Sequence, residues 1–289
     1  QDSREPSLRE FISSIPANPP SPKTLDHTFN FLSNVPCFSD LEIEKSASGA
    51  SEKIELQPKQ SAIFICGNWY DPRKTPVLLA KRHNELARGV KRVPLVIGGA
   101  QGRLTSAQQQ KFGGEHLAHK RALIANGVPE NEIIIISKVP DTQHTGHIAD
   151  DLVSALLHAG GKSGEERSKE QTSCEFAREL KNGFTLHVIE ECYLLRRVRC
   201  TLIGRLRRAK SQLIEVNKWP GNVEFHGTWS ENLECNVQNL VKVHNQNAAI
   251  AYVMMILELQ RLPIYCQRFQ IFNFTWEDVM AGVNFAKEF

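Results

Sequence analysis

Four short apolar runs, each followed by a stretch of helical pattern, constrain the fold of this chain more than any other feature of its sequence. The runs span residues 61–66, 93–97, 132–137 and 184–189. The helical stretches that follow them span residues 76–88, 115–126, 147–158 and 194–213. Parallel strands need a long crossover, usually a helix, to return to the same end of a sheet, so this alternation predicts βαβ units. The sequence therefore predicts an α/β fold with a mainly parallel sheet.

The segments before and after these units are harder to place. Residues 1–60 are expected to be an N-terminal extension, because residues 16–22 are proline-rich and residues 46–53 have the composition of a flexible linker. A short helix is expected at residues 25–32. Residues 61–289 are expected to form a single domain, in which the polar stretch at about 160–183 is a mobile surface insertion.

Three further elements are predicted in the second half of the chain. The apolar stretch at residues 213–216 is a candidate for a fifth strand, and helices are expected around residues 237–259 and 276–287. These would add C-terminal helices to the α/β unit.

Composition limits the class of protein. With 289 residues, of which 41% are hydrophobic, the chain can bury a large core. Its 35 basic and 32 acidic residues nearly cancel, which argues against nucleic acid as a partner. No stretch reaches the ~20 consecutive apolar residues of a membrane span. The seven scattered cysteines include no CxxC pair, which favours reduced thiols and a cytoplasmic location, with a removed N-terminal leader as the alternative.

Glycines end two of the apolar runs. Gly67 follows the first, with Asn68 after it, and Gly98 and Gly99 follow the second, with Gly102 three residues on. Small residues at the carboxyl edge of a parallel sheet allow a ligand to approach the backbone. We therefore expect these five residues to line a small-molecule site, although a tight turn would also explain the glycines.

Three later positions are expected at the same edge. Thr145 precedes the helix that follows the third run, and Arg196 and Arg197 begin the helix that follows the fourth. Arginine at a helix N-terminus opposes the helix dipole, which points to a bound anion or to the acidic pair Glu190 and Glu191 beside it.

Three further residues are candidates for chemistry. Glu115 begins a helix and is the candidate base, or the acceptor of hydrogen bonds from a ribose, although the helix dipole favours a carboxylate there in any case. His144 and His147 lie close in sequence, but the remaining histidines are dispersed, so no metal site is expected.

The order of several motifs resembles that of the YdcF/SanA/ElyC-type family, and most closely its soluble YdcF-like branch. The similarity extends from about residue 24 to the C-terminus. The motifs that carry it are ICGN (65–68), PLVIGGAQG (94–102), GE (114–115), LIANGVPENEIII (123–135), HTGH (144–147), RRVRCTL (196–202) and ELQRLPIY (258–265).

The resemblance implies a Rossmann-like three-layer sandwich with a pocket at the carboxyl edge of the sheet, and S-adenosylmethionine as the ligand. The pocket residues that it implies are Gly67, Asn68, Gly98, Gly99, Gly102, Glu115, Thr145, Arg196 and Arg197. This chain differs from the family at two places. It has His147-Ile148 where the family tends to have Glu-Asn, and Tyr193 where many members have histidine before the arginines.

The first functional expectation is a small-molecule binding protein that holds S-adenosylmethionine or a nucleotide-like ligand. The sequence leaves open whether it is also an enzyme. One alternative is a hydrolase or transferase that acts on a phosphorylated or envelope-derived substrate, with Glu115 as base and the two arginines stabilising negative charge. The other is a non-catalytic scaffold for a protein or nucleic acid.

Overall fold

A computed structural model describes the sheet and the helices that pack on it. The described residues are 38–39, 60–66, 80, 83–84, 93–99, 113–136, 145–160, 180–190, 194–227 and 258. Several predicted segments lie outside them: the helices at 25–32 and 276–287, nearly all of those at 76–88 and 237–259, and the insertion up to residue 179. Within the described part, no helix is long and apolar enough to cross a membrane.

The predicted α/β fold is confirmed. The sheet contains β1 (Phe38–Ser39), β2 (Ser61–Ile65), β3 (Leu95–Ile97), β4 (Ile133–Ile135), β5 (Phe184–Glu190) and β6 (Pro220–Gly227). Their order across the sheet is β1-β6-β5-β2-β3-β4. Strands β2 to β6 are all parallel, and only β1 runs antiparallel, beside β6. The five parallel strands have the order of the first five strands of the Rossmann fold.

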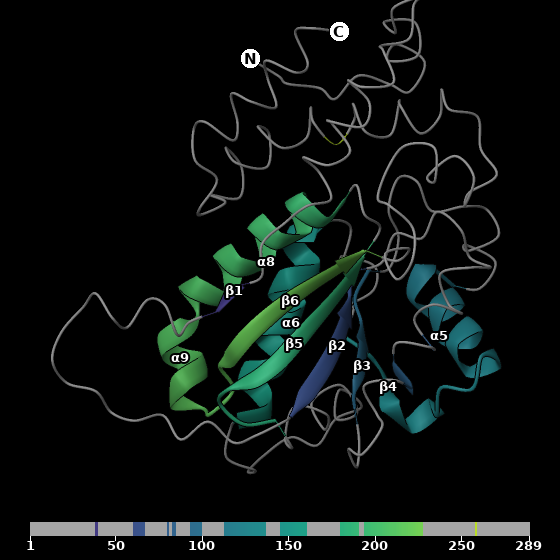
Figure 1. Cartoon of the computed structure of the whole chain (residues 1–289), viewed down its shortest axis with the longest axis horizontal. Coiled ribbons are helices and arrows are strands. Elements are labelled where there is room, and N and C mark those ends of the chain that lie inside the picture. The colour runs from purple at the N-terminus through teal and green to yellow at the C-terminus, as the bar shows by residue number, and fades with distance from the viewer. Residues whose placement is uncertain are drawn as a thin grey trace, which may run out of the picture.

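Helices cover both faces of the sheet (Figure 1). The described helices are α5 (Glu115–Ala125), α6 (Thr145–Gly160), α8 (Leu195–Arg208) and α9 (Lys210–Glu215), and a 3₁₀ turn, η2 (Glu130–Glu132), leads into β4. One hydrophobic cluster joins alternate strand residues, such as Phe64 and Val188, to α6, α8 and α9. The other cluster joins the intervening residues, such as Ile63 and Ile97, to Leu123 of α5. The molecule is therefore a three-layer α/β sandwich with a core on each face of the sheet.

Alternation along the strands explains this division. Side chains of successive strand residues point to opposite faces. On β2, Ala62, Phe64 and Cys66 belong to the cluster on the α6 and α8 side, whereas Ile63 and Ile65 belong to the cluster on the α5 side. Both sets are buried, which is why the central strands are nearly continuous apolar runs.

The candidate fifth strand at residues 213–216 was wrong. Leu213 to Glu215 form the end of α9, where Leu213 packs into the core as one residue of a helical stripe. The fifth parallel strand is instead β6, in which Val223 alternates with more exposed polar neighbours. The long helix expected at 194–213 is divided into α8 and α9 at Ala209. In the segment expected to be an extension, β1 adds two residues to the edge of the sheet.

Candidate functional site

The strand order identifies one place at the carboxyl edge where a crevice is expected. Along the chain, β3 and β4 are added on one side of β2, and β5 and β6 on the other. The topology therefore reverses between β2 and β5, and ligands of open α/β sheets bind outside the carboxyl ends of the strands at such a point. The register places Ile65, at the end of β2, level with Ile97 of β3 and Ile189 of β5.

Cys66 and Glu190 follow Ile65 and Ile189 and so lie beside the point of reversal. Each of the two residues is 2% exposed. By strand alternation both point to the face that α6 and α8 cover. A thiol and a carboxylate from adjacent strands are thus buried at the position where the fold class places its ligands.

A buried ion pair lies next to these two groups. Arg197, in the first turn of α8, is 6% exposed, and its Nε donates to Oε2 of Glu258 at 2.6 Å while Nη2 donates to Oε1 at 3.3 Å. Glu258 is 1% exposed. Charged groups are costly to bury unless they are paired and hydrogen-bonded, so this two-point contact explains how both charges are retained.

The charges of Glu190 and Arg197 both act on the thiol of Cys66. Burial raises the pKa of the Cys66 thiol well above its ordinary value of 9.0, and the negative charge of Glu190 raises it further, while the positive charge of Arg197 acts in the opposite direction. Cys66 is therefore a protonated thiol at neutral pH and is not an activated nucleophile.

The two glycines that follow β3 have different structural requirements. Gly98 donates its N–H to the carbonyl of Ile65 at 2.9 Å, and a Cβ atom at this position would lie 2.2 Å from Cγ2 of Ile148. Gly98 therefore lets the first turn of α6 pack closely on β3. Gly99 has φ of 87°, a conformation that residues with a side chain rarely adopt.

The contact between Gly98 and Ile148 also fixes where α6 begins. Because Ile148 lies in the first turn of α6, the N-terminus of that helix, at Thr145, lies at the carboxyl edge near Gly98. Its backbone N–H groups favour negative charge on a ligand.

The structure brings together part of the predicted site. Gly98, Gly99 and the starts of α6 and α8 lie at the carboxyl edge, which includes Thr145, the half-buried Arg196 and the buried Arg197. Glu115 is buried at the first position of α5, on the opposite face of the sheet from α8. Gly67, Asn68 and Gly102 lie outside the described residues.

The partner of Arg197 was not among the residues predicted. The arginine pair was expected to face a bound anion or the neighbouring acids, whereas the described carboxylate that contacts Arg197 belongs to Glu258, 61 residues further along. Glu258 is the single acidic residue of the stretch 237–259 that was predicted as helix, and it begins the ELQRLPIY motif. No local sequence pattern shows that Arg197 is its partner.

These features define a Rossmann-like α/β protein with buried charged groups at the switch point of its sheet. No family model, curated protein or solved structure matches the chain.

Proposed function

We propose that the chain binds a small nucleotide-like molecule at the carboxyl edge of its sheet, and that S-adenosylmethionine is the ligand. The observation that carries this proposal is the reversal of strand order between β2 and β5, together with the buried carboxylate of Glu190 beside it. The resemblance to the YdcF-like branch is a separate ground for choosing S-adenosylmethionine.

The groups at this edge suit the polar parts of such a ligand. A carboxylate such as that of Glu190 accepts hydrogen bonds from ribose hydroxyl or amino groups. The N-terminal amides of α6 and the guanidinium of Arg196 favour the carboxylate of the methionine part. With donor and acceptor aligned, methyl transfer needs little further chemistry from the protein.

The hydrolase or transferase alternative has less support. It requires Glu115 and the arginines to act on one substrate, but Glu115 begins a helix on the face of the sheet opposite α8. In addition, the charge of Arg197 is already compensated by Glu258. Arg197 is thus better suited to holding the edge together than to stabilising a new negative charge.

Isothermal titration of the full chain with S-adenosylmethionine tests the proposal. We expect one equivalent to bind, and Glu190→Gln to weaken binding by roughly tenfold to 100-fold because a charge-assisted hydrogen bond is lost. Glu130→Gln is the matched control, since Glu130 is exposed and lies before β4 at the opposite edge. Absence of binding, or equal affinity of Glu190→Gln and the parent chain, would contradict the proposal. Titrations with ATP and adenosine then show which part of the ligand is recognised.

A further inference from the structure

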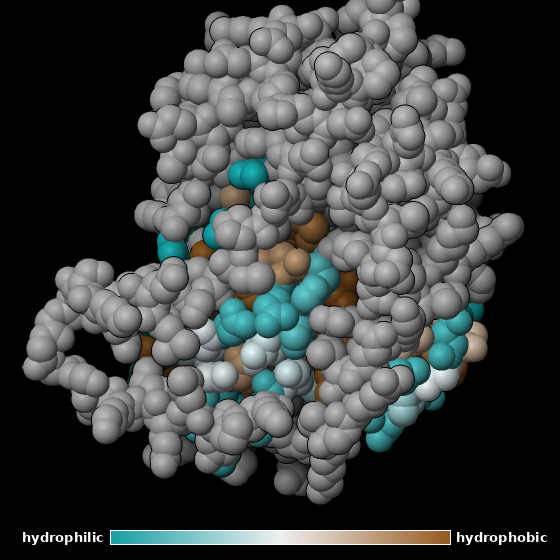
Figure 2. Space-filling view, in the orientation of Figure 1, coloured by the Kyte–Doolittle hydropathy of each residue, from teal (hydrophilic) through white to brown (hydrophobic). Residues whose placement is uncertain are grey.

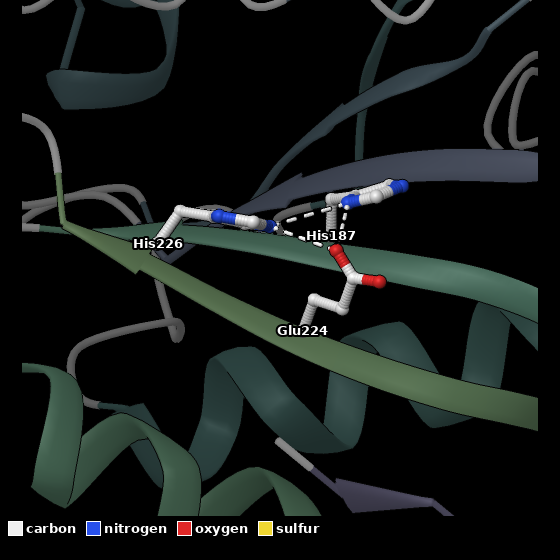
Figure 3. A group of neighbouring side chains, drawn as sticks. All are labelled: His187, Glu224 and His226. Atoms are coloured by element: carbon white, nitrogen blue, oxygen red, sulfur yellow. Dashed lines mark hydrogen bonds and ion pairs between the residues drawn. The ribbon is translucent and has the colours of Figure 1, made fainter. Parts of the chain in front are cut away.

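Three side chains with metal-binding atoms converge on the face of the sheet opposite α6 and α8. His187 of β5 pairs in register with Glu224 of β6, and His226 follows two residues after Glu224, on the same face. Figure 3 shows the two imidazole rings and the carboxylate pointing toward one another. We call these three residues the His-Glu-His cluster.

The three atoms that approach one another form a nearly equilateral triangle. Nδ1 of His187 lies 3.2 Å from Nε2 of His226 and 3.2 Å from Oε2 of Glu224, and Nε2 of His226 lies 3.3 Å from the same oxygen. Zinc binds nitrogen and oxygen at ~2.0–2.2 Å, so two ligands of a tetrahedral ion are about 3.3–3.6 Å apart. The triangle thus has nearly the dimensions of one face of a zinc coordination tetrahedron before any side chain moves.

A neighbouring residue orients the carboxylate. Nδ2 of Asn222 donates to Oε1 of Glu224 at 3.0 Å, which leaves Oε2 directed at the histidines. Outer hydrogen bonds of this kind fix the direction of metal ligands and contribute substantially to metal affinity. Ile63 lies beside His187 in the register, and Ile189 beside His226, so apolar side chains border the cluster.

One ligand of the cluster is buried, and the other two are partly exposed to solvent. The side chain of His187 is 7% exposed, whereas those of Glu224 and His226 are 31% and 25% exposed. Figure 2 shows hydrophilic side chains gathered over β5 and β6 in the same region. An ion can therefore enter from this side, and a fourth coordination position would face the opening.

Hydrogen bonding alone satisfies this triangle less completely than a cation does. A neutral imidazole carries one ring proton, and both histidines donating to Oε2 would place two donor nitrogens 3.2 Å apart without a hydrogen bond between them. A divalent cation would satisfy all three atoms at once and would also balance the carboxylate charge.

We infer that His187, Glu224 and His226 form a binding site for a divalent transition-metal ion, with Zn²⁺ the best match to two imidazoles and one carboxylate. Three protein ligands with an open fourth position resemble catalytic zinc sites, which keep a water there, more than closed structural sites. This inference does not rest on the ligand proposed for the carboxyl edge, and it departs from the expectation that the chain holds no metal.

Zinc titration of the metal-stripped full chain tests the inference, with binding followed by isothermal titration in a reducing buffer. One equivalent is expected to bind with a Kd on the order of 1 μM or below. We expect His226→Ala to weaken binding at least 100-fold, and Asn222→Ala, which keeps all three ligands, to weaken it by about tenfold to 100-fold. His147→Ala removes an exposed histidine from α6 and should leave the affinity unchanged.

Two further measurements make the result decisive. Co²⁺ in place of zinc should give the strong visible absorption of a tetrahedral site, and His226→Ala should abolish it. Glu224→Gln preserves the shape of the side chain, so it tests the site if His226→Ala fails to fold, and it should weaken zinc binding at least tenfold. Absence of tight binding by the parent chain would overturn the inference. It would also be overturned if Glu224→Gln and Asn222→Ala bound zinc as tightly as the control His147→Ala.

Discussion

Arg197 and Glu258 form a buried two-point ion pair that joins the first turn of α8 to a residue 61 positions further along the chain. Both side chains are almost completely shielded from solvent, and the arginine also acts on the buried thiol of Cys66 at the end of β2. Glu258 is therefore held at the carboxyl edge, near the point where the strand order reverses.

Removing one partner of this pair should destabilise the protein strongly. Glu258→Ala leaves the guanidinium of Arg197 buried without its described counter-charge, which costs about 3–5 kcal/mol of unfolding free energy. Arg197→Met together with Glu258→Leu should be much less damaging than either single change, because no uncompensated charge remains. Urea unfolding of the single and double variants measures these differences. Additive losses in the double variant would show that the pair does not act as a unit.

Gly98 should not tolerate a side chain. In Gly98→Ala the new Cβ would overlap with Cγ2 of Ile148, so either the Ile148 side chain or α6 must shift, and we expect a loss of about 1–3 kcal/mol. Ile148→Ala makes room at that place at its own cost of about 2–5 kcal/mol. The double variant should lose at least about 1 kcal/mol less than the sum of the single variants in thermal or urea unfolding. A simple sum would show that the close contact is not the reason for glycine here.

The raised pKa of Cys66 should make unfolding depend on pH in the alkaline range. The folded state holds the thiol proton more tightly than the unfolded state. The contribution of this thiol to the free energy of unfolding is therefore fully present below about pH 9 and is lost as pH rises beyond it. The parent chain should lose up to about 1.4 kcal/mol per pH unit more than Cys66→Ala does. Urea midpoints between pH 8 and 10.5 measure this difference, and parallel curves for the two proteins would contradict it.

His119 should have the opposite effect in the acid range. Burial lowers the pKa of this α5 histidine well below 6.5, and the positive charge of His116 lowers it further. The unfolded chain binds the proton more readily than the folded chain. The contribution of His119 to the free energy of unfolding is therefore present above about pH 6.5 and is lost as pH falls. His119→Gln should therefore lose less stability between pH 7 and 5 than the parent chain. Equal loss of stability in His119→Gln and the parent chain over this pH range, followed by urea unfolding, would contradict the prediction.

The central strands could be predicted because they are buried on both faces. The residues of β2, β3, β4 and β5 form mainly apolar runs. Such runs can be recognised as strands without knowing which strands lie beside them. In contrast, β6 has one partly exposed face, and its Val223 and Phe225 alternate with polar residues. The stretch at 213–216, with three apolar residues in four, therefore gave the stronger but misleading signal. Two-residue β1 has too little pattern to be predicted alone.

Contacts that depend on strand register, or on the packing of segments far apart in the sequence, could not be predicted. His187 and Glu224 are adjacent only because β5 and β6 pair in one particular register. Arg197 and Glu258 meet only through tertiary packing. The sequence showed that two glycines follow β3. It did not show that Gly98 allows α6 to pack closely or that Gly99 has a positive φ.

The central claim is that the reversal point between β2 and β5 is the ligand site, and a crystal structure of the full chain grown with S-adenosylmethionine tests it most directly. We expect electron density for the ligand outside the carboxyl ends of these strands, with polar contacts to the N-terminal turn of α6 or α8 and to Glu190. A ligand bound elsewhere, or a carboxyl edge filled by the protein's own side chains with no ligand in it, would contradict the account.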